Sequence, residues 1–294
     1  MFSPFILDNQ DLILEIKRQV EKKDQSLYTH DTVDNLEINK NTISIIMTSH
    51  NRSKQVYFTL ETILKSVIKD VQIILVDDST TDPIDIDTIR NFPFYIDFIQ
   101  IKPENKKWCN PCVNYNIGFQ YIKGSKVIIQ NSEVCHVGDV LSIVQKIVTD
   151  NHYYVFDVKA SLNYETNDVI YNEDLSNTSI YQKEELFYWW YQSQSNNRNF
   201  HFLTACSTKT FKRINGLSYD YMMGINYDDN DLVLKIRSLN INIINLFHNV
   251  YMIGGIHLYH DPSTTWNNVQ SNQQLFNYKM NIYNETGIYV NLIF

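Results

Sequence analysis

Cysteine, glycine and proline are scarce in this sequence of 294 residues, which contains four, eight and six of them. Four cysteines are too few for the disulfide framework of a chain of this length. The glycines form neither the G-x-G-x-x-G pattern of dinucleotide-binding folds nor the G-x-x-x-x-G-K-S/T pattern of P-loop enzymes. These absences exclude both usual modes of nucleotide binding, so side chains would have to hold any nucleotide that binds.

Positive charge and long apolar runs are also scarce. Lysine and arginine number 25 against 33 aspartates and glutamates, a net charge of −8. This balance argues against nucleic-acid binding, which usually requires a basic face, but a metal ion could still balance a phosphorylated ligand. Charged residues interrupt the first apolar residues, and no run is long enough to cross a bilayer. We therefore expect no transmembrane segment, and a cytoplasmic protein or one peripheral to a membrane.

Hydrophobic residues make up 44% of the chain, enough for a sizeable core. In the first half, short apolar runs alternate with helical patterns. Strands are expected at 43–47, 71–76, 96–101 and 126–130, and helices at 56–67 and 113–121. This alternation is typical of βαβ units and predicts an α/β fold with a mostly parallel sheet. Ligands of such sheets bind at the carboxyl ends of the strands, where polar residues cluster here.

The two ends of the chain are less regular. Residues 1–40 are expected to form an N-terminal helical extension, with Leu12, Ile13, Ile16 and Val20 on one face of a helix. The second half predicts strands at 153–158 and 250–256 and helices at 184–191 and 229–238. A tail at 263–294 is rich in asparagine, glutamine and tyrosine. No linker interrupts the pattern, so residues 41–294 are treated as a single domain.

The segments ISIIMTSHNR, from Ile43, and VDDSTTD, from Val76, together resemble the opening of family 2 glycosyltransferases. The resemblance implies the GT-A fold, a Rossmann-like α/β fold whose mostly parallel central sheet is flanked by helices. It also implies that Thr48 and Asp78 contact the base and ribose of a nucleotide. Their neighbours Asn51, Arg52 and Asp77 are candidates for the same site. Capping of a turn or helix is the alternative for both aspartates.

Two further segments extend the resemblance. Asn110 to Gly118 is similar to the family segment that ends in RNxG, which implies that Asn116 lies beside the sugar nucleotide; helix packing is the alternative. Asn131-Ser132-Glu133 stands where the family carries Asp-x-Asp. Glu133 would then bind a divalent cation, Mn²⁺ or Mg²⁺, and Asn131 would offer a carbonyl oxygen. The alternative is that Glu133 caps a helix.

The segments 215–220 and 224–232 resemble the family pattern GFD…G…EDxDL. The resemblance implies that Asp229, second in the acidic pair, is the catalytic base; the alternative is that the acids complement the dipole of a helix. A late histidine often completes the metal sphere of such enzymes. Both His257 and His260 are candidates, and the choice between them is left open.

The resemblance as a whole implies metal-assisted, inverting transfer from a nucleotide sugar, most often a UDP-sugar, to a hydroxyl of a glycan or other acceptor. Residues 41–140 would form the nucleotide-binding half, 141–262 the acceptor-binding half and 263–294 a C-terminal tail. Trp189, Trp190 and Tyr191 would form either a stacking platform for an acceptor sugar or part of the core. A silent sugar-nucleotide or glycan-binding domain is an alternative. A nucleotidyltransferase is another, but the sequence lacks its basic, glycine-rich loop.

Overall fold

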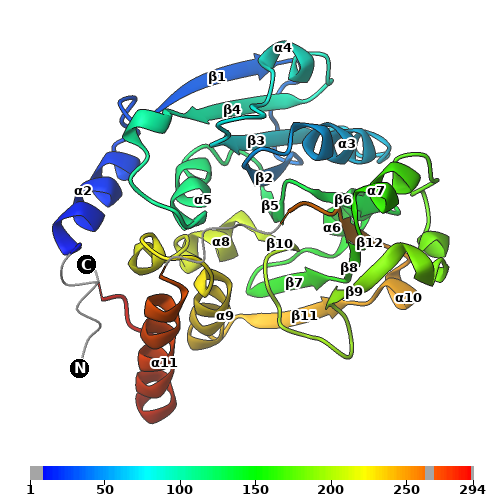
Figure 1. The fold of residues 1–294 in the computed structure, drawn as a ribbon. Coiled ribbons are helices and arrows are strands. Elements are labelled where there is room, and N and C mark those ends of the chain that lie inside the picture. The colour runs from blue at the N-terminus through cyan, green and yellow to red at the C-terminus, as the bar shows by residue number, and fades with distance from the viewer. Residues whose placement is uncertain (1–8, 262–267, 293–294) are drawn as a thin grey trace.

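The structure is a computed structural model and describes residues 9–261 and 268–292. Its larger sheet has eight strands in the spatial order β1-β4-β3-β2-β5-β10-β7-β11 (Figure 1). In chain order these strands are β1 (Tyr28–Asp34), β2 (Ile43–Ser49), β3 (Val71–Asp77), β4 (Tyr95–Ile101), β5 (Lys126–Asn131), β7 (His152–Phe156), β10 (Leu203–Ser207) and β11 (Asn242–Leu246).

Most of these strands run in one direction. The pairs β4–β3, β3–β2, β2–β5 and β7–β11 are parallel, whereas β10 is antiparallel to both of its neighbours and β1 is antiparallel to β4. Only β1 and β10 therefore run against the other six. The prediction of an α/β fold with a mostly parallel central sheet is confirmed.

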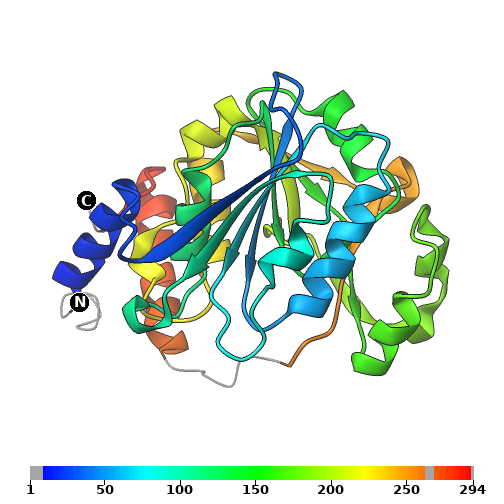
Figure 2. The same ribbon diagram turned by 90° about the horizontal axis from the view of Figure 1, so that it is seen from above.

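Helices cover both faces of this sheet (Figure 2). The helices are α2 (Gln10–Glu21), α3 (Ser53–Leu64), α4 (Ile86–Ile89), α5 (Cys112–Phe119), α6 (Val140–Ile147), α7 (Tyr164–Ile170), α8 (Thr208–Ile214), α9 (Asp228–Ser238), α10 (His248–Tyr251) and α11 (Val269–Thr286). Side chains of a strand point alternately to its two faces. In β2, Ile46 accordingly packs into the core beneath α2, α5, α8 and α9, while Ile45 and Met47 pack into the core beneath α3 and α6.

A second, smaller sheet has the order β6-β12-β8-β9, formed by β6 (Val134–Val137), β8 (Val158–Ser161), β9 (Phe187–Gln192) and β12 (Gly254–His257). Strand β12 pairs antiparallel with β6 and parallel with β8. Because β6 follows β5 after two residues, this sheet stands beside the carboxyl ends of the parallel strands.

Four segments differ from the sequence expectation or were left without an assignment there. The N-terminal segment 1–40 contains, besides helix α2, the edge strand β1, so it is not only helical. The helix expected at 184–191 is wrong: Phe187–Gln192 is strand β9, preceded by one short 3₁₀ turn. The expected strand at 250–256 is shorter, since α10 precedes β12, and most of the described tail is helix α11.

One glycine brings a helix unusually close to the sheet. A Cβ atom on Gly118 of α5 would lie only 3.1 Å from Val76 and 3.2 Å from Ile46, two strand side chains. Glycine thus lets α5 lie low over β2 and β3, which places the first turn of the helix beside the ends of these strands. Within the described ranges, no helix combines the length and apolar character that crossing a membrane requires.

Candidate active site

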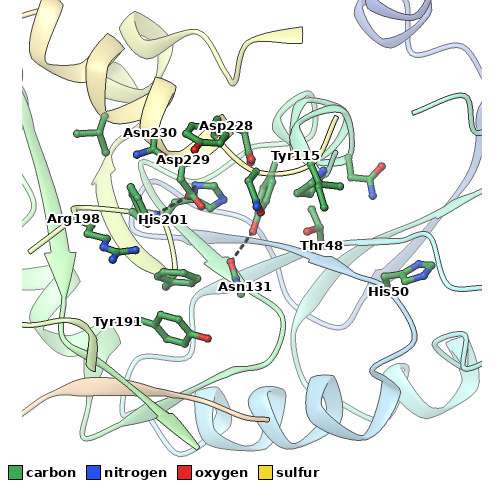
Figure 3. A pocket seen from close by; sticks show the side chains of 18 of the residues that line it. Thr48, His50, Tyr115, Asn131, Tyr191, Arg198, His201, Asp228, Asp229 and Asn230 are labelled. Carbon is green, nitrogen blue, oxygen red and sulfur yellow. Dashed lines mark hydrogen bonds and ion pairs between the residues drawn. The ribbon is translucent and has the colours of Figure 1, made fainter. Parts of the chain in front are cut away.

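A cavity of about 1070 Å³ lies at the carboxyl ends of β2, β3 and β5. Thr48, Asp78 and Asn131 line it from these strand ends, and Asp229 faces them from the start of α9. Figure 3 shows Thr48, Asn131 and Asp229 around the same space. The cavity is therefore where an open α/β sheet is expected to bind its ligand.

Asp78 is held by three side chains at the end of β3. Its carboxylate accepts hydrogen bonds from Nδ1 of His50 at 2.8 Å and Nδ2 of Asn114 at 2.7 Å, and Nζ of Lys106 lies 2.5 Å away. Burial alone would raise the pKa of Asp78, but these three partners lower it to about 2. Asp78 is thus ionised at neutral pH and faces the cavity, as its predicted role requires.

Asp77 and Asn51 do not line the cavity. The carboxylate of Asp77 is fully buried and accepts hydrogen bonds from the main-chain N–H groups of Ser79 and Ile84. Oδ1 of Asn51 accepts from the N–H groups of the next three loop residues, 80–82, at 2.9 to 3.1 Å. Both side chains stabilise the loop after β3. For Asp77 this is the alternative role given above, the capping of a turn.

Asn116 also lies outside the cavity. It donates from Nδ2 to the carbonyl of Leu217 and accepts from the Leu217 N–H, both at 2.9 Å. Helix α5 instead presents Asn114 and Tyr115 to the cavity. The hydroxyl of Tyr115 donates to the carbonyl of Gln130 at 2.9 Å and lies 3.4 Å from Oδ1 of Asn131. Asn131 and Thr48 both line the cavity beside it.

The main chain places Glu133 beside the two late histidines. Strands β6 and β12 pair so that His257 lies opposite Val134, and Leu258 donates its N–H to the carbonyl of Glu133 at 3.0 Å. Oε1 of Glu133 is then 3.1 Å from Nε2 of His257 and 3.5 Å from Nε2 of His260. The three predicted metal ligands therefore form one group, whose candidate ligand atoms all lie within 4.8 Å of one another.

Arg52 joins this group as a cation. Its Nη1 lies 2.8 Å from Oε1 of Glu133, a carboxylate that is 1% exposed. Burial alone would raise the pKa of Glu133, but Arg52 and the two histidines hold it well below its usual range. Burial lowers the pKa of His257, which favours the neutral imidazole that metals bind. Arg52, expected to contact a nucleotide, thus lines the cavity as the partner of Glu133.

Asp229 is paired with a histidine that the sequence analysis missed. Nδ1 of the buried His201 lies 2.5 Å from Oδ1 of Asp229, the pair joined by a dashed line in Figure 3. Burial alone would lower the pKa of His201, but the charges of Asp229 and Asp228 raise it. Burial and the charge of Asp229 raise the pKa of Asp228 to about 6. One imidazole thus faces two neighbouring carboxyl groups at the edge of the cavity.

The loop before Asp228 is fixed by the C-terminal helix. Asn226 and Tyr227 have φ of 64° and 70°, a left-handed conformation that costs energy for residues other than glycine. Asn272 of α11 lies with Nδ2 3.2 Å from the carbonyl of Tyr221 and 3.0 Å from that of Asn226. These bonds hold the loop in the conformation that turns Asp228 and Asp229 toward the cavity.

Lys279, a buried cation, holds the aspartates on both sides of this loop. Nζ of Lys279, a fully buried side chain, lies 2.7 Å from Oδ2 of Asp220 and 3.1 Å from Oδ1 of Asp231. Asp231 also accepts a hydrogen bond from the hydroxyl of Tyr289. Asp231 is therefore a structural acid, although it belongs to the same acidic motif as Asp229.

The sequence contains signals for some of the residues that were missed. His50 lies inside the segment that carries the family resemblance, and Asn114 lies two positions before Asn116. Lys106 and His201 have no such signal, because each meets its aspartate only through the fold. Their sequence separations from Asp78 and Asp229 are both 28 residues.

The model of glycosyl transferase family 2 matches residues 44–213, more than half of the chain. This chain belongs to glycosyltransferase family 2. The match covers the strand ends that carry Thr48, Asp78 and Glu133, whereas Asp229 and α11 lie beyond it. No curated protein sequence matches this family member.

Two structures of S. aureus TarS agree with the fold. S. aureus TarS superposes with a TM-score of 0.55 at 13% identity, over 83% of this chain and 40% of TarS. Its fragment 1–349 in complex with UDP-GlcNAc gives 0.52 at 12% identity, over 83% of this chain and 67% of the fragment. A mannosyltransferase from Pyrobaculum calidifontis, in complex with GDP-Man and Mn²⁺, gives 0.46 at 13% identity, over 87% and 65%. This family 2 member thus spans less than two thirds of the mannosyltransferase and of full TarS.

Proposed function

We propose that this protein transfers a sugar from a nucleotide-sugar donor, a UDP-sugar, to a hydroxyl group of an acceptor, with inversion at the anomeric carbon and assistance from a divalent cation. The observation that carries the proposal is the arrangement of three acidic groups around one cavity. Asp78 and Glu133 have lowered pKa values and lie at the strand ends, while the Asp228–Asp229 pair lies across the cavity beside His201. Two sets of acids with different environments fit two different tasks.

The strand-end residues are proposed to bind the donor. Asp78, held ionised by His50, Lys106 and Asn114, would accept hydrogen bonds from the ribose hydroxyls or the base. Thr48 lies one strand away, since it pairs with Val76 in the register of β2 and β3. The structure of the TarS fragment with UDP-GlcNAc makes UDP-GlcNAc the first donor to test.

Glu133, His257 and His260 fit a divalent cation. One carboxylate and two imidazoles are ligands that Mn²⁺ accepts, and all three ligand atoms converge within 4.8 Å. When bound, the cation would offset the negative charge that develops on the leaving nucleoside diphosphate. Arg52 already places a positive charge 2.8 Å from the same carboxylate, so it would share this task.

Asp229 is proposed to be the general base. The acceptor oxygen attacks the anomeric carbon, the bond from that carbon to the diphosphate oxygen breaks, and the hydroxyl proton passes to the carboxylate of Asp229. Nδ1 of His201 lies 2.5 Å from this carboxylate, and both residues line the cavity. A single displacement of this kind inverts the anomeric centre.

Thermal unfolding and donor hydrolysis test the proposal together. We expect UDP and UDP-GlcNAc to raise the melting temperature more than GDP, and more with Mn²⁺ than with EDTA. Slow release of UDP from UDP-GlcNAc in the presence of Mn²⁺ would separate an enzyme from a silent binding domain. Equal shifts with Mn²⁺ and with EDTA would show that Arg52 alone, without a divalent cation, balances the charge of the diphosphate. No shift by any nucleotide would contradict the proposal. The cytoplasmic location expected from the sequence stays a prediction.

A further inference from the structure

A second, smaller pocket of about 410 Å³ lies outside the cavity, on the edge strand β9 of the smaller sheet. Its size is within the range of pockets that bind small molecules. The residues that line it are aromatic or polar: Lys159, Glu184, Phe187, Tyr188, Trp189, Trp190, Ser195 and Asn196. The donor site described above uses none of them.

Trp189 connects this pocket with the cavity. Its ring centroid lies 5.0 Å from that of Tyr191, and the guanidinium carbon of Arg198 lies 5.5 Å from it. Tyr191 and Arg198 both line the cavity, and Figure 3 shows them along one of its sides. Tyr191 in turn packs against the candidate metal ligand His257, with ring centroids 4.9 Å apart. An aromatic surface therefore runs from the proposed reaction centre to the second pocket.

The charges of the second pocket balance each other. Lys159 has a side chain that is 3% exposed, and its Nζ lies 3.1 Å from both Oε1 of Glu184 and the carbonyl of Tyr181. The carboxylate of Glu184 is 81% exposed and closes the ion pair from the solvent side. The pair therefore has no net charge, and its exposed member is the carboxylate of Glu184. The pocket offers flat rings beside hydrogen-bonding groups, which suits an uncharged sugar.

From this arrangement we infer that the acceptor is a neutral glycan of at least two sugars, whose reacting end enters the cavity while a neighbouring sugar binds in the Trp189–Trp190 pocket. The sugar ring would lie against the partly exposed rings of Trp189 and Trp190, and its hydroxyls would bond to Glu184 or Asn196. Two register shifts let Phe187–Gln192 pair with the four residues Val158–Ser161, whose three steps of roughly 3.3 Å give strand β9 a length of about 10 Å. This distance matches a short stretch of a sugar chain. Only the part of the inference that concerns the reacting end rests on the proposed function.

An array of neutral and acidic oligosaccharides, one to six sugars long, tests the pocket without a transfer assay. We expect the wild-type protein to bind neutral glycans of two or more sugars. Trp189→Ala should weaken this binding about tenfold, and Trp189→Phe, which keeps a flat ring, should restore most of it. Phe92→Ala changes a partly exposed aromatic residue far along the chain from β9 and should leave binding unchanged.

The outcomes separate this inference from the proposed function. Binding of no glycan, binding of acidic glycans in preference to neutral ones, or equal binding by wild type and Trp189→Ala would overturn the inference. The melting-temperature shift with UDP and Mn²⁺ is measured on the same variants and should be the same in all of them. A retained UDP shift without glycan binding therefore contradicts only the pocket, whereas glycan binding without any nucleotide shift contradicts only the proposed function.

Discussion

The two sides of the cavity are held in different ways. The side proposed to bind the donor, here the donor wall, is formed by Thr48, Asp78, Asn131 and Glu133. It stands on the ends of adjacent parallel strands and the turn after β5, so strand register sets its geometry. The side proposed to face the acceptor, here the acceptor wall, is formed by His201, Asp228 and Asp229 and depends on a strained loop and on side chains of helix α11. Residues on the donor wall are thus placed mainly by strand pairing within the sheets, and those on the acceptor wall by side-chain contacts with helix α11.

This difference between the two walls can be tested by substitution. If the two walls have separate tasks, changes on the donor wall should affect binding of nucleotide or metal. Changes on the acceptor wall should affect turnover and leave binding unchanged. Each of the following substitutions tests one side of that division.

The largest effect is expected for Asp229→Asn. The amide keeps the shape of the side chain but cannot accept the acceptor's proton, so transfer should fall by roughly 10²–10⁴-fold. UDP affinity should stay within about twofold of wild type. The transfer rate and the UDP dissociation constant are the measurements. Near-normal transfer, or a loss of UDP binding, would contradict the assignment.

Asp231→Asn is the comparison from the same motif. Asp231 pairs with Lys279 rather than facing the cavity, so its substitution should lower the melting temperature. Removing one partner of a buried pair typically costs about 3–5 kcal/mol. A stability loss in this variant and a rate loss in Asp229→Asn would distinguish the structural acid from the base.

Glu133→Gln tests the metal on the donor wall. The variant loses the one carboxylate in the group with His257 and His260, so Mn²⁺ affinity should fall by roughly 10–100-fold. Asn131→Asp, its companion, adds a charged oxygen beside the same group and should tighten Mn²⁺ binding. Calorimetric titration with Mn²⁺ measures both. Identical affinities in the wild type and both variants would place the cation elsewhere.

Asp78→Asn tests the nucleotide on the donor wall. Loss of a charged hydrogen-bond acceptor should weaken UDP binding by about tenfold or more. Asp82→Asn is the matched control, because Asp82 is exposed in the same loop and bonds to Ser53 rather than facing the cavity. Equal UDP affinities in these two variants would contradict the assignment of Asp78.

The Asp78→Asn variant should also differ from the wild type in its stability at low pH. The pKa of Asp78 is lowered to about 2 in the folded protein, whereas an unfolded aspartate has a pKa of about 3.9. Ionised Asp78 therefore stabilises the fold above pH ~4, and this contribution is lost as the pH falls toward 2. Asp78→Asn should remove that part of the acid destabilisation, which unfolding curves between pH 2 and 5 can measure.

The smallest effect is expected for Asn272→Ala, which loosens the loop before Asp228. Turnover should fall about tenfold, because misplacing a catalytic group lowers the rate without changing donor contacts. UDP affinity should be unchanged. Asn277→Ala, at an exposed position of the same helix, should match the wild type in both. A parallel loss of UDP binding in Asn272→Ala would show that the two walls are not independent.

The sequence predicted the elements whose burial is visible as apolar runs. Strands β2 to β5 and helices α3 and α5 lie where expected, because their side chains form the two cores of the sheet. Strand β1 was missed because its polar residues lie at an exposed edge. The aromatic run of β9 was assigned to a helix, although aromatic residues favour strands. Leu275 is the one apolar residue of helix α11 that is buried, and buried polar contacts such as those of Lys279 hold the helix in place.

Within the site, the sequence located each motif but did not distinguish which of its neighbouring residues faces the cavity. Asp77 and Asp78 are equivalent in a sequence pattern, but one bonds to its own loop and the other faces the cavity. Asn51 and Asn116 match family motifs and yet serve the main chain of loops. The pattern predicts where a loop bearing functional residues lies, and only the fold decides which side chains of that loop face the ligand.

The bonds from Asn272 and Lys279 also affect the order in which the two walls form while the protein is being synthesised. A growing chain leaves the ribosome from its N-terminus, and its early segments can fold before later ones exist. The donor wall is complete once residues up to 260 have emerged, whereas the loop that carries Asp229 gains its last restraints only with α11. Nascent chains should therefore acquire nucleotide binding before the loop that carries Asp229 gains its last restraints.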